Sequence, residues 1–211
     1  MVDRPLLELE DVIMQGENDL SVGPISLKLF PRGRVWLEGF EADQVAAIES
    51  LLAGQKKHIA GRLLEAKPVQ FLSDQIIRQR YDFHQSISDF LESHAAPSQV
   101  WLEGRKRSVR VLVDRLGLTP KDMRSPVHLS SGPVQDKFIA LRLLLSRADI
   151  LLISSFLHKL DTSVKTMLAS HWGDFPGVII AACDDTDLPG VPDLHRAFEN
   201  GQIVIGPRNQ Q

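Results

Sequence analysis

Three short apolar runs constrain the fold more than any other feature of this chain. They read Val-Trp-Leu at 35–37, Ile-Leu-Leu-Ile at 150–153 and Val-Ile-Ile-Ala-Ala at 178–182. A run without polar alternation suits a strand covered on both faces, as in a parallel sheet between helices. Helical periodicity recurs between these runs, at 43–53, 135–145 and 163–172. The sequence therefore predicts an α/β fold, in which we expect 35–37 and 150–153 to be neighbouring parallel strands.

The remaining segments add an antiparallel part and a helical part to this core. Residues 6–12 alternate only in part and indicate an edge strand, whereas 25–29 alternate strictly, as a half-buried strand does. Short strands are also expected at 61–64 and 68–72. Residues 76–128 have a helical pattern, which we interpret as a subdomain inserted into a single domain of residues 1–211. Asn-Gly at 200–201 predicts a closing hairpin.

Composition excludes several classes of function. The 24 basic and 27 acidic residues give a net charge of -3, so no nucleic-acid partner is expected. Cys183 is the single cysteine, which rules out an intramolecular disulfide and suits a reducing cytoplasm. No apolar stretch reaches the roughly 18 residues that span a bilayer, and the N-terminus has no apolar signal region. The seven histidines show no metal-ligand spacing. We expect a cytoplasmic protein without a metal site.

The sequence GFEADQVAAIESLLAG, which starts at Gly39, has the outline of a phosphate-binding loop without its chemistry. Such a loop, G-x-x-x-x-G-K-[ST], wraps phosphates in backbone N–H groups, neutralises them with Lys and holds Mg²⁺ with a hydroxyl. Here Val45 replaces the Lys and Ala46 the hydroxyl residue, while Glu41 and Asp43 place carboxylates where a polyphosphate would lie. We expect this loop not to hold ATP.

The order of these segments resembles the nucleotide-binding domain of ABC transporters over nearly the whole chain. Residues 6–12 and 25–39 resemble the run into Walker A, and 130–161 align without a gap to the signature helix, Walker B strand and D-loop. VIIAACDD at 178–185 matches the strand before the switch histidine, and FENGQIV at 198–204 the closing hairpin. The resemblance implies a P-loop-ATPase-like core with a mostly parallel sheet, an antiparallel N-terminal part and a helical insert. An unrelated α/β protein with a fortuitous pattern is the alternative.

The resemblance also implies a catalytic set that this chain lacks. Ser154 stands where the Walker B Asp places Mg²⁺, Ser155 where the catalytic Glu lies, and Cys183 where the switch His belongs. A hydroxyl lacks the charge that a hard cation requires. The glutamine that contacts Mg²⁺ aligns with Asp74, or with Gln75 after a shift of one residue. We therefore expect neither catalysis nor a bound cofactor.

Three residues of the signature and D-loop agree with the family pattern. Ser131 and Gly132 align with the family's Ser-Gly, and a one-residue slip gives the closer literal match Leu-Ser-Ser-Gly at 129–132. In ABC dimers this segment faces ATP bound to the opposite subunit. It can therefore cover a partner's nucleotide even when the chain's own phosphate-binding loop binds none. The simpler interpretation is a serine N-cap with proline in the first turn. Asp161 keeps the D-loop position, where it caps the next helix or touches a partner.

These substitutions predict a function in contacts rather than in chemistry. The resemblance implies a catalytically inactive structural or regulatory subunit that pairs with an active ABC ATPase subunit, a membrane permease, or both. Such a subunit is peripheral at the inner membrane through its complex. The alternative is a soluble adaptor outside transport, and a repurposed enzyme would need a convergent polar site. Permease docking predicts an apolar groove between insert and core. Tyr81 and Phe83 are of types enriched at interfaces, or they pack the insert onto the core.

Overall fold

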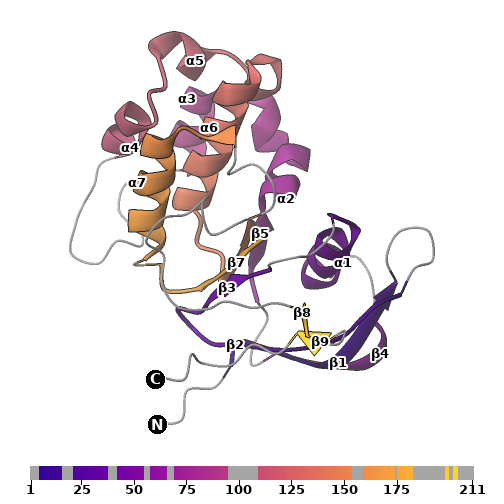
Figure 1. The fold of residues 1–211 in the computed structure, drawn as a ribbon. Helices are drawn as coiled ribbons and strands as arrows, with labels where there is room; N and C mark the ends of the chain where they lie inside the picture. Colours follow the sequence, from indigo (N-terminus) through magenta and orange to yellow (C-terminus); the bar gives the residue numbers. More distant parts are fainter. Residues whose placement is uncertain are drawn as a thin grey trace.

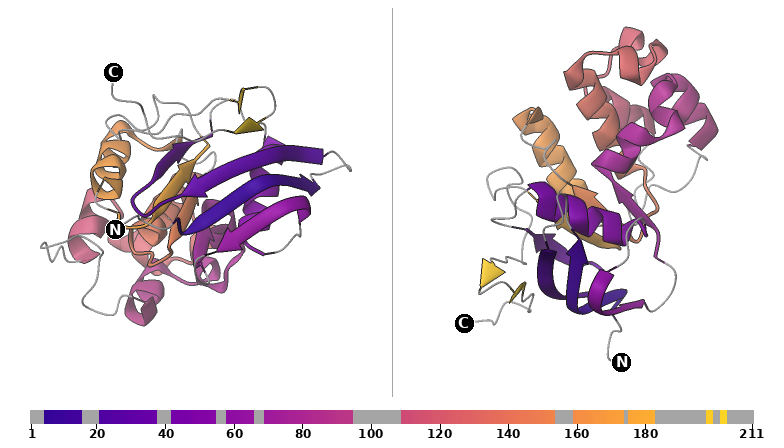
Figure 2. Two further views of the ribbon diagram at one scale, coloured as in Figure 1. Left: turned by 90° about the horizontal axis from the view of Figure 1, so that it is seen from below. Right: turned by 90° about the vertical axis from the view of Figure 1, so that its right-hand side faces the viewer.

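The computed structural model describes residues 5–15, 21–37, 42–54, 58–65, 69–94, 109–153, 159–173 and 175–182, together with short strands at 198–199 and 202–203. These residues form an α/β fold in layers (Figure 1). An antiparallel sheet lies at one end, a parallel sheet in the middle, and a group of helices at the other end. The side view in Figure 2 shows the same order, with helix α1 (Ala42–Leu52) beside the two sheets.

The antiparallel sheet has the order β2-β1-β4, with strands β1 (Leu7–Gln15), β2 (Ser21–Leu29) and β4 (His58–Glu65). The expectation of an edge strand at 6–12 was wrong, because β1 pairs on both sides. Its alternation is incomplete because the strand bulges at Asp11, whose φ is 48°. Gly61 fits beside this bulge, since a Cβ there would lie 2.4 Å from the Asp11 carbonyl oxygen. The bulge, not an open edge, explains the broken pattern.

The parallel sheet has the order β3-β7-β6-β5, with strands β3 (Arg34–Trp36), β5 (Phe71–Ser73), β6 (Ile150–Ile153) and β7 (Val178–Ala181). All of β6 and β7 is buried, which confirms the two-sided cover. The predicted pairing of β3 with β6 was wrong, because β7 lies between them. Apolar runs indicate burial, but they carry no information on strand order.

Alternate residues of the central strands face two separate apolar cores. One core lies between the parallel sheet, α1 and the antiparallel sheet, and receives Ile150, Leu152, Val178 and Ile180. The other lies under the helices and receives Leu151, Ile153, Ile179 and Ala181. This division is the period-two geometry of a strand, applied to a sheet with cover on both sides.

Helices occupy the stretch predicted to be helical, within the described residues. They are α2 (Asp74–Gln79), η2 (Tyr81–His84), α3 (Ile87–His94), α4 (Val109–Arg115), α5 (Pro120–Arg124) and η3 (Val127–Leu129). Two further helices, α6 (Gly132–Leu144) and α7 (Thr162–Trp172), follow this stretch in the chain. Ser73 caps α2, because its Oγ accepts a hydrogen bond from Ile76 N at 3.0 Å. The strands β8 (Phe198–Glu199) and β9 (Gln202–Ile203) pair as the expected hairpin.

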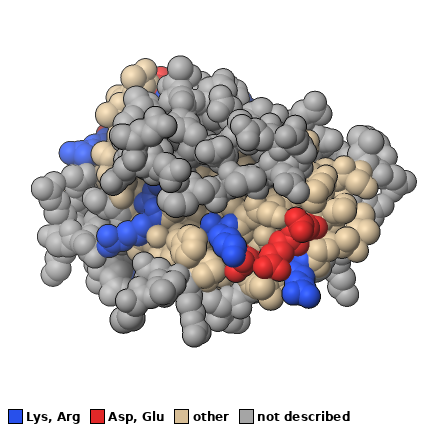
Figure 3. Space-filling model, turned by 60° about the horizontal axis from the view of Figure 1, so that its bottom comes forward, with Lys and Arg blue, Asp and Glu red and all other residues tan. Residues whose placement is uncertain are grey.

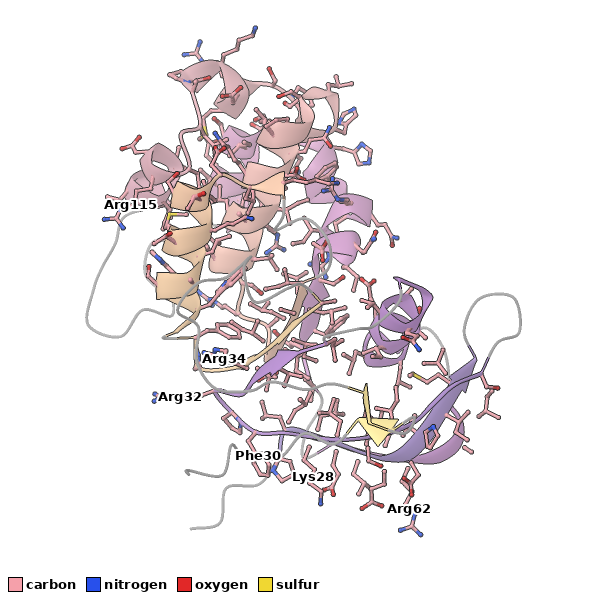
Figure 4. All side chains as sticks on the ribbon, in the orientation of Figure 1. Lys28, Phe30, Arg32, Arg34, Arg62 and Arg115 are labelled. Atoms are coloured by element: carbon pink, nitrogen blue, oxygen red, sulfur yellow. The ribbon has the colours of Figure 1, made fainter. Side chains whose placement is uncertain are left out.

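Arg34 is a buried cation that joins three elements at the end of the parallel sheet. From β3 its guanidinium donates hydrogen bonds to the carbonyls of Trp172, Phe175 (2.7 Å) and Gly177 (3.0 Å). These carbonyls belong to the end of α7 and the turn before β7. Figure 4 shows Arg34 at that end of α7. Burial, together with a smaller effect of the nearby charge of Arg32, lowers the pKa of Arg34 to about 10.

We expect Arg34→Met to lower the free energy of unfolding by about 2–4 kcal/mol, because several buried carbonyls lose their only charged donor. Arg34→Lys should restore little, since one ammonium cannot reach carbonyls on both sides as the planar fork does. Chemical denaturation measures both effects. Arg32→Met, at the exposed neighbouring position, is the control and should stay close to wild type. A stable Arg34→Met protein would show that the carbonyls find other donors.

Candidate functional site

Val45, which we predicted to take the position of a phosphate-binding lysine, packs into the core. Val45 lies near the start of α1, is 7% exposed, and belongs to the core shared with the antiparallel sheet. Ala46 beside it is half-buried. Gly39 lies outside the described residues. The start of α1 thus directs an apolar side chain inward at the position where a phosphate-binding loop carries its cation.

The other positions of the catalytic set follow the ends of two central strands. β6 ends at Ile153 and β7 at Ala181. Ser154, Ser155 and Cys183 come directly after these segments, outside the described residues, so their roles stay predictions.

A polar hollow of ≈ 450 Å³ brings the Mg²⁺-glutamine position and the signature position together. Asp74, the first residue of α2, is 3% exposed, and Gln75 beside it is exposed. Both line the hollow, together with Gly132 at the start of α6 and Lys159. The two registers for the glutamine position therefore lead to the same surface.

An ion pair fixes one wall of this polar hollow. Arg78 of α2 donates a hydrogen bond to the Asp136 carboxylate of α6 at 2.7 Å, with side-chain exposures of 31% and 7%. Because the carboxylate is almost fully buried, its charge depends on this partner, and loss of Arg78 would leave it unbalanced. The pair therefore holds α2 against α6.

The surviving signature and D-loop residues are helix N-caps whose side chains make no capping bond. Ser131 caps α6 by position and Asp161 caps α7 by position, and both are exposed. Gly132 is exposed as well, with open space where a Cβ would lie. The N-cap interpretation is right about position. The Ser131 hydroxyl, however, accepts no hydrogen bond from the first N–H groups of α6. Both interpretations of this segment stay open.

A second hollow, of ≈ 350 Å³, lies between α1, β5 and α2; we call it the α1–α2 groove. Its lining consists of five half-buried apolar residues and two exposed polar ones: Leu52, Ala53, Val69, Phe71, Ile76, Gln79 and Arg80. The groove follows the open edge of the parallel sheet, because β5 is its last strand. It lies where the core helix α1 meets the first helix of the helical stretch.

A hydrogen bond from α1 to the cap of α2 connects the two walls of this groove. The Ser73 hydroxyl donates to the Glu49 carboxylate while its oxygen caps α2. Burial raises the pKa of Glu49, the hydrogen bond from Ser73 opposes this rise, and the charge of Asp74 adds to it. One serine therefore sets both the start of α2 and its distance from α1.

Phe83, one of the two proposed interface residues, is a core residue in this fold. Its side chain is 7% exposed and packs edge-on against Phe138 of α6, with ring centroids 6.0 Å apart. This contact favours the packing interpretation for Phe83. The backbone of Tyr81 lies in η2, and its side chain lies outside the described residues.

Charges of both signs share the outer face of the antiparallel sheet. Figure 3 shows blue and red side chains close together there, and Lys28 forms an ion pair with Glu8. That contact raises the pKa of Lys28. Mixed charge of this kind makes no field of one sign for a polyanion. Within the described part of the chain, helices fall short of the length and apolar character that crossing a membrane requires.

Sequence reasoning missed Glu49 and most of the α1–α2 groove. Glu49 stands between Ile48 and Leu51 on a mainly apolar helix, and a carboxylate in that setting indicates a specific partner. Val69 and Phe71 give no such signal, because their half-exposure depends on β5 being the last strand. A local sequence pattern cannot predict a groove that forms between elements far apart in the chain.

Comparison with known proteins gives matches at the level of fold. No family model matches the sequence, and no curated protein matches it closely enough to count as a relative. Among solved structures, an inward-facing ABC transporter, proposed to be of the metal-chelate type, matches with a TM-score of 0.67 and 13% identity, over 97% of this chain and 84% of that one. A bacterial Atm1-family ABC exporter with ATP bound matches with a TM-score of 0.68 and 15% identity, over 97% of this chain and 39% of the exporter chain. The chain thus shares its fold with ABC transporter chains and spans under half of the exporter chain.

The isolated chain should not bind Mg-ATP, and restoring a single residue should not restore turnover. Calorimetric titration should be flat, because several charge-assisted contacts of about 1.5–3 kcal/mol each are missing. Val45→Lys should give no phosphate release, since catalytic residues act as a set. It should also lower thermal stability, because it places a charge in the core. A micromolar dissociation constant would overturn the interpretation of this loop.

Glu49→Gln should flatten the dependence of stability on pH. Because the folded-state pKa of Glu49 is raised, its favourable contribution is complete below the unfolded pKa of 4.5 and is lost as pH rises through the folded value. The glutamine oxygen still accepts from Ser73 and has no ionisation to lose. The difference in melting temperature between variant and wild type should therefore increase from pH 4 towards pH 7.

Asp122→Asn is the matched control, with the opposite sign. Hydrogen bonds from the Thr119 hydroxyl and backbone N–H lower the pKa of Asp122, so its contribution is present at neutral pH and is lost on acidification. The asparagine variant should be less stable than wild type at pH 7 and should approach it in acid. Parallel curves for Glu49→Gln and wild type would contradict the argument for Glu49.

Proposed function

We propose that this chain is a catalytically inactive ABC-ATPase-like subunit that serves as a structural or regulatory member of a transporter complex. It pairs with an active ATPase domain, docks on a membrane permease, or does both. It lies in the cytoplasm and reaches the membrane only through these partners. The fold shared with ABC transporter chains supports this proposal at the level of architecture.

The α1–α2 groove is the observation that carries the proposal. A permease that docks on the junction of core and helices needs an apolar recess there, and the chain presents five half-buried apolar residues around such a recess. An adaptor outside transport needs no recess at this junction. Gln79 and Arg80 stand at the exposed rim, where polar groups orient a docked helix without the desolvation of a buried charge.

The start of α1 supports the absence of catalysis. A phosphate-binding loop needs its cation free to reach the ligand, whereas Val45 is part of the core beneath α1. Burial of a valine in such a place stabilises the fold by about 1.5–3 kcal/mol. The position therefore contributes to stability through packing and offers no charge to a nucleotide.

The exposed start of α6 supports pairing with an active ATPase. Its first N–H groups and Gly132 face outward without a side-chain cap, and they border the polar hollow with Lys159. This arrangement suits an anion presented by another chain. The partner would contribute the nucleotide, the metal and the catalytic carboxylates that this chain lacks.

Ala53→Arg tests the docking proposal, because it fills the groove and removes little of the core. The untagged chain should co-purify from detergent extracts with a permease or with an ATPase that has an intact phosphate-binding loop. Recovery of that partner with Ala53→Arg should fall roughly tenfold or more, as a blocked interface of about 2 kcal/mol implies. Circular dichroism should show an unchanged melting temperature.

Ile59→Arg is the matched control. Ile59 is 61% exposed in β4, outside the groove, and the same arginine there should leave recovery unchanged. Equal loss of the partner in both variants would show that any added charge weakens the complex. Capture of soluble proteins alone, with neither permease nor ATPase, would favour the adaptor and contradict the transporter proposal.

A further inference from the structure

Two histidines from distant parts of the sequence meet on the surface of the helical group. His84 ends η2, and His128 lies within η3. Their rings are 4.6 Å apart between centroids, with planes tilted by 50°, and both side chains are exposed. The spacing of the histidines along the chain gave no hint of this contact.

The two segments that carry these rings are held together by their own backbones. Ser86 and Pro126 form a β-bridge, and Val127 N donates to the Gln85 carbonyl at 3.0 Å. Phe83 and Val127, next in sequence to the two histidines, are both buried in the helical core. The Cα positions of the pair are therefore fixed, while exposure leaves the rings free to turn.

The polar surroundings of the pair add two facts. Gln135 Nε2 donates to the His128 carbonyl at 3.3 Å, which ties η3 to α6. Gln85, beside His84, has a buried side-chain oxygen with no hydrogen-bond partner among the described residues.

We propose that His84 and His128 form a two-imidazole site for a divalent late transition-metal ion of the Ni²⁺, Cu²⁺ or Zn²⁺ class. With a metal–nitrogen distance of about 2.0–2.1 Å and a nitrogen–metal–nitrogen angle of about 90–110°, two imidazoles on one ion have ring centres roughly 4.5–5.2 Å apart. The observed 4.6 Å lies within this range. Neutral imidazole is a good ligand for these ions, whereas Mg²⁺ and Ca²⁺ prefer oxygen.

The site is open, and the ion acts as a clamp. Among the described residues no group of three or more His, Cys, Asp or Glu comes together as a metal site, so water fills the remaining positions on the ion. The ion joins η2 to η3; in the chain, η2 comes just before α3 and η3 just after α5. Because it binds the folded arrangement and not the separated histidines, it stabilises the helical group by mass action. This site is independent of the transporter proposal.

The test is calorimetric titration of the protein, without a histidine tag, with NiCl₂, ZnCl₂ and MgCl₂ in a non-chelating buffer. We expect one Ni²⁺ or Zn²⁺ per chain and no heat from Mg²⁺, because imidazole nitrogen suits the first two ions and Mg²⁺ prefers oxygen. Replacing a ligand should weaken binding at least as much as the roughly 10–100-fold typical of supporting residues, so His84→Ala and His128→Ala should each lose tenfold or more.

Two further measurements separate this site from adventitious binding. Bound Cu²⁺ should give an electron paramagnetic resonance signal with two nitrogen ligands, reduced to one in either single variant. His58→Ala, which changes a histidine on β4, should bind as wild type does. Ni²⁺ should raise the melting temperature of wild type and of His58→Ala, and should not raise that of the His84 or His128 variants. Absence of binding, or binding that survives both substitutions, would overturn the proposal.

Discussion

The central strands β6 and β7 bury every side chain, and this two-sided burial determines what can surround them. Alternate residues along each strand need apolar partners on opposite faces. On one face α1 and the antiparallel sheet supply them, and on the other the helical group does. The two cores share only the sheet between them. Among the described residues β5 is the last strand of the parallel sheet, and the α1–α2 groove lies along it.

Arg34 provides hydrogen bonds to the backbone carbonyls that this arrangement buries. A chain that leaves α7 and turns back into β7 exposes several carbonyls at the place where the core must be dry. A carboxylate cannot satisfy carbonyls, and a water molecule brings no charge, whereas a guanidinium donates to several at once. Its depressed pKa reflects the burial that this role requires. The arginine stabilises the turn because its fork donates to the carbonyls of Trp172, Phe175 and Gly177 at the same time.

The features of this fold that depend on neighbouring residues in the chain, such as buried strands, were predictable from the sequence. The apolar runs at 150–153 and 178–182 indicated buried strands, and both are. The order of the strands was not predictable, because burial does not encode which run lies beside which. The bulge at Asp11 disguised a central strand as an edge strand. The burial of Val45 follows from its place on an apolar helix face, while the groove, the Glu49–Ser73 bond and the His84–His128 contact each join residues far apart in the chain.

The start of α1 links these observations to the proposed role. In a nucleotide-binding loop this turn must keep a lysine and several N–H groups available, which limits how far the helix packs inward. With valine at position 45, α1 packs against the antiparallel sheet through Val45, Ala47, Ile48 and Leu51. A firmly packed α1 gives the groove a rigid wall, and the bond from Glu49 to Ser73 holds the opposite wall in register. A rigid recess loses little entropy when a partner enters it. The buried valine that we interpret as incompatible with nucleotide binding is therefore also compatible with the docking role that we propose for the groove.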